Sequence, residues 1–266
     1  MQRIDSKLKQ KLIKLADKYE THEFIKDDPS QFLYYYKNPR DIELCAFIAS
    51  LLSFGNRKQF IPKITYIMNL ADEEGGIYNW LKNHCFEKFF SPSNNCKFYR
   101  FYSYKDLYFL FEKLAEILDI EKSFGLYLSY KYTEKLNQLS NSTNIESSIS
   151  DKINLIDVIA ECFTSCSIVP GTKTSAKKRL CMFLRWMVRD NSPVDIGLWP
   201  WYPKSNLLIP LDVHVLEEAK KLNLINQKAT ATRKTAEELS AIALQIFSDD
   251  PCRLDYALFG IGVDSK

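Results

Sequence analysis

Helical spacing of apolar residues is the feature that most constrains the fold of this chain. Strand-like alternation is scarce, and only 8 glycines and 10 prolines interrupt 266 residues. This combination is typical of helices joined by longer connections rather than of a sandwich or a barrel, so we predict an all-α fold. The segments in which apolar residues recur every three or four positions are 42–53, 61–72, 104–118, 123–137, 155–163, 177–188, 214–222 and 236–247.

Composition limits the class of protein. Hydrophobic residues make up 46% of the chain, enough for one large domain or two small ones. The formal net charge of +3 is too small to indicate nucleic-acid binding by itself, so a phosphate-binding surface would need local clusters of basic residues. Two such clusters are Asn56-Arg57-Lys58 and the segment 173–189. The segment 138–152, rich in Ser and Asn, is the predicted loop or linker.

The cysteines and the N-terminus indicate the compartment. Seven cysteines form no Cys-x-x-Cys pair, which argues against a disulfide framework and against a zinc site. The first 20 residues mix Lys and Asp with apolar residues at helical spacing, unlike a signal peptide. No apolar run approaches membrane-spanning length. We therefore expect a cytoplasmic protein with reduced thiols and no membrane partner.

Two helix starts carry residues that could do chemistry. The segment 208–215 reads Leu-Ile-Pro-Leu-Asp-Val-His-Val and places Asp212 at the start of a helix, downstream of a helix led by Lys177 and Lys178. A lysine and a carboxylate of this kind could perform nucleophilic chemistry on an anionic polymer. The simpler interpretation is that Asp212 is an N-cap and that the lysines are solvated surface residues.

The order of these elements resembles that of the helix-hairpin-helix DNA glycosylase superfamily, and most closely its 8-oxoguanine DNA glycosylase/lyase branch. The resemblance rests on the Pro170-Gly171 turn, on Lys178 followed by Phe183-Leu184-Arg185, and on Asp212 followed by Val213-His214-Val215. The segment 184–199 also resembles a bacterial subgroup of this superfamily. The resemblance implies a two-lobed helical bundle, with a central lobe at 41–205 and a second lobe from 1–40 and 206–266. DNA would bind in the groove between the lobes.

The chain departs from the superfamily pattern at two places. The hairpin reads Val-Pro-Gly-Thr-Lys-Thr and lacks the second glycine, so Lys173 competes with Lys177 and Lys178 for the role of nucleophile. The separation between Lys178 and Asp212 is also longer than in typical members, which implies an inserted loop at about 189–206. Its tryptophans, Trp199 and Trp201, either stack on bases or anchor the loop by core packing.

The resemblance implies roles for the residues at these positions. Lys178 would attack C1′ of the damaged nucleoside and form a Schiff base, and a neighbouring cation, Lys177 or Arg179, would favour the neutral amine. Asp212 would deprotonate the nucleophile or stabilise the oxocarbenium-like transition state. His214, in the first helical turn, would support the site rather than act as general base. No metal is needed for this chemistry, and no cofactor is expected, because only Cys252 follows Cys181 and an iron–sulfur cluster needs four cysteines.

Further residues would bind DNA by the same resemblance. Asn56, Arg57 and Lys58 follow an apolar helix at the place where superfamily members insert a side chain into the gap left by an extruded base, with Asn56 or Arg57 as the wedge. The alternative is an ordinary polar loop between helices. The residues expected to contact phosphates at the hairpin are Gly171, Lys173 and Lys177.

The last helix is expected to contribute the base pocket. Phe259 occupies the position of a phenylalanine that stacks on the extruded base, and Asp255, one turn earlier, that of a residue that reads its edge. The alternative is that Phe259 belongs to the core, because Leu254, Leu258 and Ile261 form an apolar face.

The leading hypothesis is therefore a monomeric glycosylase and abasic-site lyase that removes an oxidised purine from double-stranded DNA. One alternative is a monofunctional glycosylase in which Asp212 alone activates water. The other is a non-catalytic helical protein that binds nucleic acid.

Overall fold

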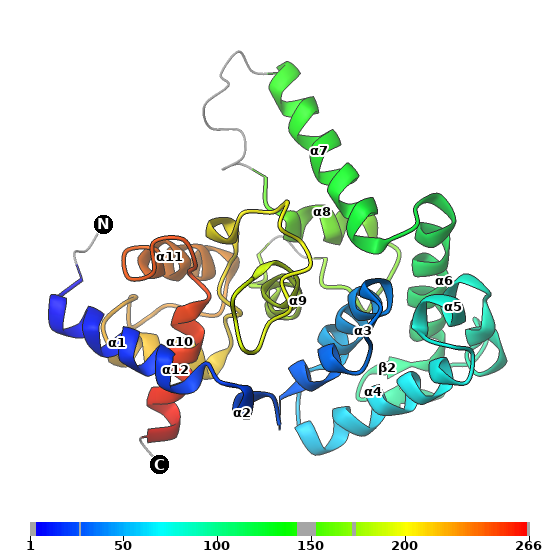
Figure 1. Cartoon of the computed structure of the whole chain (residues 1–266), viewed down its shortest axis with the longest axis horizontal. Coiled ribbons are helices and arrows are strands. Elements are labelled where there is room, and N and C mark those ends of the chain that lie inside the picture. The colour runs from blue at the N-terminus through cyan, green and yellow to red at the C-terminus, as the bar shows by residue number, and fades with distance from the viewer. Residues whose placement is uncertain (1–3, 27, 143–152, 172–173, 265–266) are drawn as a thin grey trace. The chain divides into compact units, whose positions relative to one another are not determined.

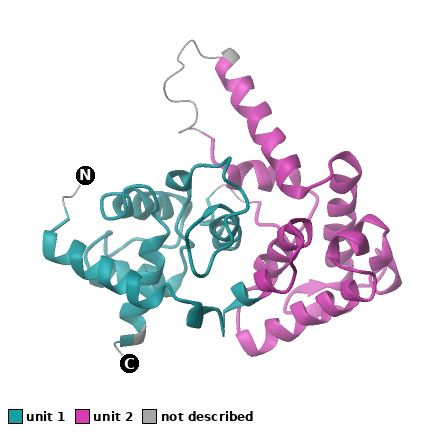
Figure 2. Ribbon diagram, viewed as in Figure 1, with its two compact units in different colours: residues 1–31, 172–266 teal, residues 32–171 magenta. Residues whose placement is uncertain are grey.

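The computed structural model of this chain describes residues 4–26, 28–142, 153–171 and 174–264. The described residues are predominantly helical, which confirms the predicted all-α fold (Figure 1). Each of the eight segments with helical apolar spacing forms a helix, with ends that differ from the predicted ones by a few residues. The chain divides into two compact units, residues 32–171 and residues 1–31 together with 172–266 (Figure 2).

The unit of residues 32–171 is built around one buried helix. Helix α3 (Pro39–Leu52) begins with the Asn38 cap and a proline, and it is apolar around its whole circumference, so nearly all of it lies in the core. Phe47 packs against Phe124 and Phe163, with ring centroids 4.9 Å and 5.1 Å away. The other helices of this unit are α4 (Arg57–Asp72), α5 (Ile77–Lys82), α6 (Tyr104–Ile120), α7 (Phe124–Ser142) and α8 (Leu155–Cys162), with the short 3-10 helices η1 (Pro29–Tyr34), at the boundary between the units, and η2 (Cys85–Lys88).

A short β-hairpin interrupts the helices of this unit. Strands β1 (Lys97–Tyr99) and β2 (Tyr102–Ser103) pair in antiparallel fashion. The hairpin lies within an aromatic segment that has no helical or strand periodicity in sequence. Phe98 packs against Phe90 and Tyr104, at centroid distances of 5.9 Å and 5.2 Å, and this contact holds the hairpin against the unit.

The unit formed by the two ends of the chain has its own hydrophobic core. Helix α12 packs along α1. A Cβ atom on Gly260 would lie 2.2 Å from Cδ2 of Tyr19, so only glycine permits this close approach. The helices of this unit are α1 (Ser6–Tyr19), α2 (His22–Ile25), α9 (Lys178–Val188), α10 (Val213–Lys221), α11 (Arg233–Ala243) and α12 (Arg253–Asp264), with the short 3-10 helix η4 (Lys204–Asn206).

The division between the units differs from the one expected from the sequence. Residues 172–205, which include α9, belong with the two ends of the chain and not with the central segment. Two buried arginines of this segment, Arg185 in α9 and Arg189 at its C-cap, have acidic partners that come mainly from the terminal segments and from the loop after α9. The predicted linker at 138–152 is partly helical, since α7 continues to Ser142, and residues 143–152 lie outside the described part of the chain.

Candidate active site

The candidate site is an ion pair between the first residues of two helices. Lys178 is the first residue of α9, and Asp212 is the N-cap of α10. Lys178 Nζ donates a hydrogen bond of 2.7 Å to Asp212 Oδ2, across 34 positions of sequence. Both side chains are partly exposed, at 39% and 29%, so both can be reached from solvent. The structure therefore brings together the two residues that the sequence assigned to catalysis.

The long connection between these residues folds back on α9. The backbone N–H groups of Ile196 and Gly197 donate to the carbonyl oxygen of Trp186, and that of Trp199 donates to Met187. These bonds satisfy carbonyl groups at the end of α9 that have no partner within the helix. Trp199 is buried against Phe183, at 5.2 Å between ring centroids, so core packing is the role of this tryptophan. The inserted loop thus returns the chain to the start of α10.

Asp212 is held in its ionised form. Its Oδ1 accepts a 2.9 Å hydrogen bond from the backbone N–H of Val215, as a helix cap does. Burial acts to raise the pKa of this carboxyl, but the charge and hydrogen bond of Lys178 and the bond from Val215 outweigh it, and the pKa is lowered. The N-cap role predicted as the simple alternative is therefore real, and it coexists with the pairing to Lys178.

Asp255, on α12, is electrostatically linked to this pair. Its Oδ2 accepts a 2.7 Å hydrogen bond from Nη1 of Arg185, which lies on α9. Burial raises the pKa of Asp255 to about 6, with opposition from Arg185 and support from the negative charge of Asp212. Asp255 is thus a carboxyl that exchanges its proton near neutral pH beside the lysine and carboxylate pair.

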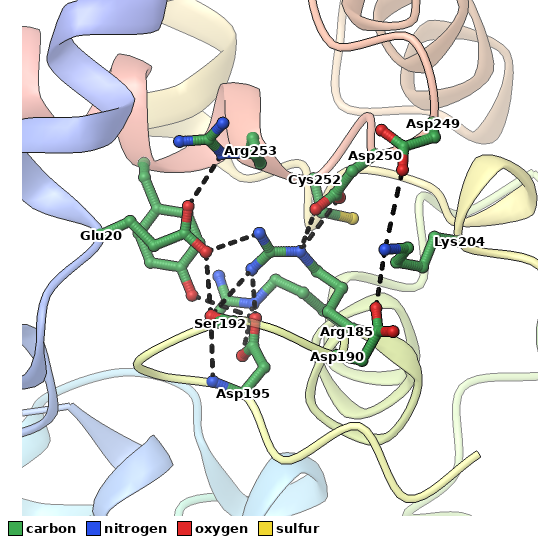
Figure 3. A network of polar contacts seen from close by, with 12 residues as sticks. Glu20, Arg185, Asp190, Ser192, Asp195, Lys204, Asp249, Asp250, Cys252 and Arg253 are labelled. Atoms are coloured by element: carbon green, nitrogen blue, oxygen red, sulfur yellow. Dashed lines mark hydrogen bonds and ion pairs between the residues drawn. The ribbon is translucent and has the colours of Figure 1, made fainter. Parts of the chain in front are cut away.

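A network of buried ion pairs surrounds the C-terminal end of α9 (Figure 3), and Arg185 joins this network to Asp255. Arg189 is bonded to three carboxylates, with Nε 2.8 Å from Asp250 Oδ2, Nη2 2.6 Å from Glu20 Oε1, and Nη1 in contact with Asp195. Arg185 and Arg189 also lie over the ring of Tyr256, at 4.8 Å and 5.3 Å. The structural role of these arginines was not predicted from the sequence. The available signal was two arginines four positions apart in an otherwise apolar helix.

Phe259 lies on α12, one turn after Asp255, and is 38% exposed. Its ring meets Phe24 edge to face at 5.0 Å and Tyr19 at 6.0 Å. The buried face of α12 instead carries Leu254 and Leu258. The alternative in which Phe259 is a core residue is therefore wrong, because its side chain lies off that apolar face and reaches solvent.

Lys177 and Gly171, which are predicted to contact phosphates at the hairpin, do not have the surroundings that such a role requires. Lys177 is only 3% exposed and has left-handed backbone at the N-cap of α9, so it is not an exposed phosphate contact. Gly171 is not among the residues with positive φ, and a Cβ atom there would meet nothing within 4 Å, so nothing in its surroundings requires glycine. Lys173 lies outside the described residues. Helix α8 ends at Cys162, so its connection to α9 is longer than a tight hairpin turn.

His214 is exposed in the first turn of α10, and it is not a core histidine. Its side chain is near enough to Asp212 that its charge contributes to the lowered pKa of that carboxyl. Its predicted supporting role therefore has an electrostatic basis.

The predicted wedge residues lie in the unit of residues 32–171. Asn56 is the N-cap of α4, and its side chain accepts a 2.9 Å hydrogen bond from the backbone N–H of Lys58. Arg57 and Lys58 form the first turn of this helix rather than a loop, and both are exposed. Because capping already uses the Asn56 side chain, Asn56 is a poor choice for the inserted residue.

One group in the same unit has the composition of a metal site. His84, Glu87 and Glu112 place their ligand atoms within 4.8 Å of one another. His84 Nδ1 lies 3.9 Å from Glu112 Oε2. None of the three had been singled out in the sequence, and none belongs to the Lys178 and Asp212 site.

The fold and the site together define an all-helical protein with a lysine and carboxylate pair at the starts of two helices. Its sequence matches, over residues 28–264, the model of a family described as Protein of unknown function (DUF2400), and the chain belongs to this family. No curated protein and no solved structure gives a significant match. In the described part of the chain, no helix combines the length and the apolar character needed to cross a membrane.

Proposed function

We propose that this protein is a DNA glycosylase with associated lyase activity that removes an oxidised purine. The observation that carries the proposal is the 2.7 Å contact between Lys178 Nζ and Asp212 Oδ2, at the two positions that resemble the nucleophile and the aspartate of helix-hairpin-helix glycosylases. A shared fold alone would not require these two side chains to meet across 34 residues.

The chemistry assigned to Lys178 is nucleophilic. After losing a proton, its Nζ forms a bond to C1′ while the bond from C1′ to the base breaks, and the departing base takes the electron pair and a proton. Opening of the sugar ring then gives the Schiff base, with a proton passing to the ring oxygen. Loss of a proton from C2′ expels the 3′ phosphate by β-elimination. Lys178 is held within reach of its proton acceptor, since its contact is Asp212 rather than a second cation.

The environment of Asp212 selects between the two roles predicted for it. A carboxyl with a lowered pKa is a weak base but stays charged at neutral pH. A fixed negative charge at this point stabilises the positive charge that develops on the sugar in the transition state. We therefore assign Asp212 mainly to electrostatic stabilisation, with proton transfer from Lys178 as a second function of the same contact.

Asp255 and Phe259 complete the proposed site. Phe259 offers a partly exposed ring on the helix that also carries Asp255, and such a ring can stack on an extruded base. Asp255 is anchored by Arg185, so its remaining oxygen keeps a fixed direction toward a ligand. As a carboxylate it would accept hydrogen bonds from the N–H groups of a purine edge.

Covalent trapping tests this function. Borohydride reduces a Schiff base, so the wild-type protein should become linked to a duplex that contains 8-oxoguanine. Lys178→Gln should abolish the linked product and retain DNA binding, because one phosphate contact among several is all that binding would lose. Lys221→Gln, at an exposed lysine paired with Glu218 on α10, is the matched control and should trap normally.

The outcomes separate the three hypotheses. Trapping that survives Lys178→Gln would reassign the nucleophile to another lysine. Excision without any trapping would favour the monofunctional alternative in which Asp212 activates water. Binding with neither excision nor trapping, across duplexes that carry different oxidised bases, would favour the non-catalytic alternative.

A further inference from the structure

Two stretches of the unit of residues 32–171 contain basic residues and no acidic ones. Residues 44–71 and 89–105 contain no Asp or Glu at all. Their six basic residues are Arg57, Lys58, Lys63, Lys97, Arg100 and Lys105. In a chain with a net charge of only +3, such segments are the local clusters that a polyanion-binding surface requires.

The structure brings these two stretches together at the start of α4. The hydroxyl of Tyr99 donates a hydrogen bond to the carbonyl oxygen of Phe54. The guanidinium of Arg100 lies over the ring of Phe54, 5.6 Å from its centroid. Gly55, with φ of +83°, leaves room for this contact, since a Cβ atom there would come within 2.5 Å of Arg100 Nη1. The tip of the β-hairpin and residues 54–58 therefore lie together, and we call the surface that they form, with the basic residues Arg57, Lys58 and Arg100, the hairpin surface.

An exposed phenylalanine stands at the tip of the hairpin surface. Tyr99 pairs with Tyr102, so the turn consists of Arg100 and Phe101 alone. Phe101 is 67% exposed, yet its ring is supported by Tyr102 at 4.6 Å and by Phe54 at 5.2 Å. An apolar ring held in place from one side and open to solvent on the other can stack on a flat partner without first being ordered.

The backbone conformation of the turn also indicates that the arginine at its first position has a role. Arg100 has φ of +52°, a left-handed conformation in which glycine or asparagine is the usual choice at a tight hairpin. An arginine held in this conformation presents a long cationic side chain beside Phe101, which a glycine would not do.

We propose that Phe101 is a wedge that inserts into the base stack of double-stranded DNA, with Arg100, Arg57 and Lys58 on the flanking phosphates. A flat ring surrounded by cations fits stacked bases between phosphate chains, whereas a protein partner would have to place several acidic groups around a single apolar side chain. The proposal takes its DNA partner from the proposed function. It moves the wedge away from Asn56, whose side chain caps α4, and it gives Arg57 a phosphate contact in place of the wedge role.

The test compares binding to two duplexes, one intact and one with a tetrahydrofuran abasic analogue next to 2-aminopurine. Phe101→Ala should weaken binding to the abasic duplex by about tenfold and remove the change in 2-aminopurine fluorescence. Phe101→Trp should keep both properties. Tyr130→Ala, at an aromatic residue of α7 with 61% exposure, is the matched control and should change neither.

A second variant separates the cation from the wedge. Arg100→Gly relieves the left-handed backbone, so its thermal unfolding midpoint should be equal to or above that of the wild type. Its binding should weaken to a similar degree on both duplexes, and the slope of log affinity against log salt should fall by about one. Arg100→Gly that binds both duplexes like the wild type would remove Arg100 from the surface.

The remaining outcomes are decisive in different ways. Phe101→Ala that binds both duplexes like the wild type overturns the wedge, as does an equal loss on single-stranded and double-stranded DNA, which would indicate a stacking platform. A wild-type protein that binds no DNA overturns the wedge and the proposed function together. If the Phe101 effects appear but no excision or trapping occurs, the wedge stands and the glycosylase proposal fails.

Discussion

The two ends of α9 use charge in opposite ways. At its first residue, Lys178 and Asp212 form one ion pair that is open to solvent, with exposures of 39% and 29%. At its C-cap, the side chain of Arg189 is 2% exposed and is bonded to three carboxylates that are at least nine-tenths buried. An exposed pair contributes roughly 0 to 1 kcal/mol to stability, whereas breaking a buried one by removing a partner costs about 3–5 kcal/mol. Charges on one helix therefore differ in what they can do: the exposed pair stays accessible to a ligand, and the buried pairs hold the fold together.

The largest effect is expected on the free energy of unfolding, from the loss of the buried Arg189. Arg189→Met should lower the free energy of unfolding by about 3–5 kcal/mol, because Glu20, Asp195 and Asp250 would remain buried without their common partner. Urea denaturation measures this loss. The excision rate per folded molecule should stay within about twofold, since the start of α9 is unchanged.

Arg253→Met is the matched control for this experiment. Arg253 also bonds Glu20, at 3.0 Å, but it is 31% exposed, so its removal should cost about 1 kcal/mol or less. An equal loss of stability in the two variants would contradict the distinction between buried and exposed pairs.

The catalytic side of the comparison is tested at Asp212. If the proposed function holds, Asp212→Asn should slow excision by about 100- to 1,000-fold, because the negative charge proposed to stabilise the transition state is lost. The free energy of unfolding should change by less than about 1 kcal/mol, since Asn caps a helix nearly as well as Asp and the pair with Lys178 is exposed. Single-turnover excision and urea denaturation measure the two effects.

Asp5→Asn, at the N-cap of α1, is the control for capping and should leave excision unchanged. Wild-type excision in Asp212→Asn would return Asp212 to a purely structural role as a helix cap.

The smallest effect is expected on the pH dependence of stability, at Asp255, which is bonded to Arg185 between the two ends of α9. Its pKa is about 6 in the folded chain, above the ordinary value for an aspartate, so between about pH 4 and pH 6 the folded state holds a proton that the unfolded state has lost. Stability from this group therefore falls as the pH rises through that window. Relative to Asp255→Asn, the wild type should lose up to about 3 kcal/mol between pH 4 and pH 8.

Urea denaturation across this pH range measures the difference, with Asp249→Asn, at an exposed aspartate, as the matched control. If the difference in unfolding free energy between the wild type and Asp255→Asn does not change from pH 4 to pH 8, Asp255 is ionised throughout this range. It would then belong with the structural ion pairs rather than with the site.

The sequence by itself determined the all-α fold, and it singled out Lys178 and Asp212, two residues that are in contact in the structure. Apolar spacing predicts helices because it reports which face of a segment can be buried, and this local property survives folding. The capping role of Asp212 is predictable in the same way, since a cap acts on the N–H groups of its own helix, two or three residues away, whereas its assignment to the site came from the family resemblance.

Only the tertiary structure decided which charged side chains are in contact with one another. The contact of Lys178 with Asp212 depends on a loop that folds back on α9, and the left-handed, buried Lys177 depends on packing around the start of that helix. The buried network draws Glu20 and Asp250 to Arg189 from opposite ends of the chain. Such contacts depend on burial and distance in space, which no local pattern of residues records, and the exposed Phe101 became visible for the same reason.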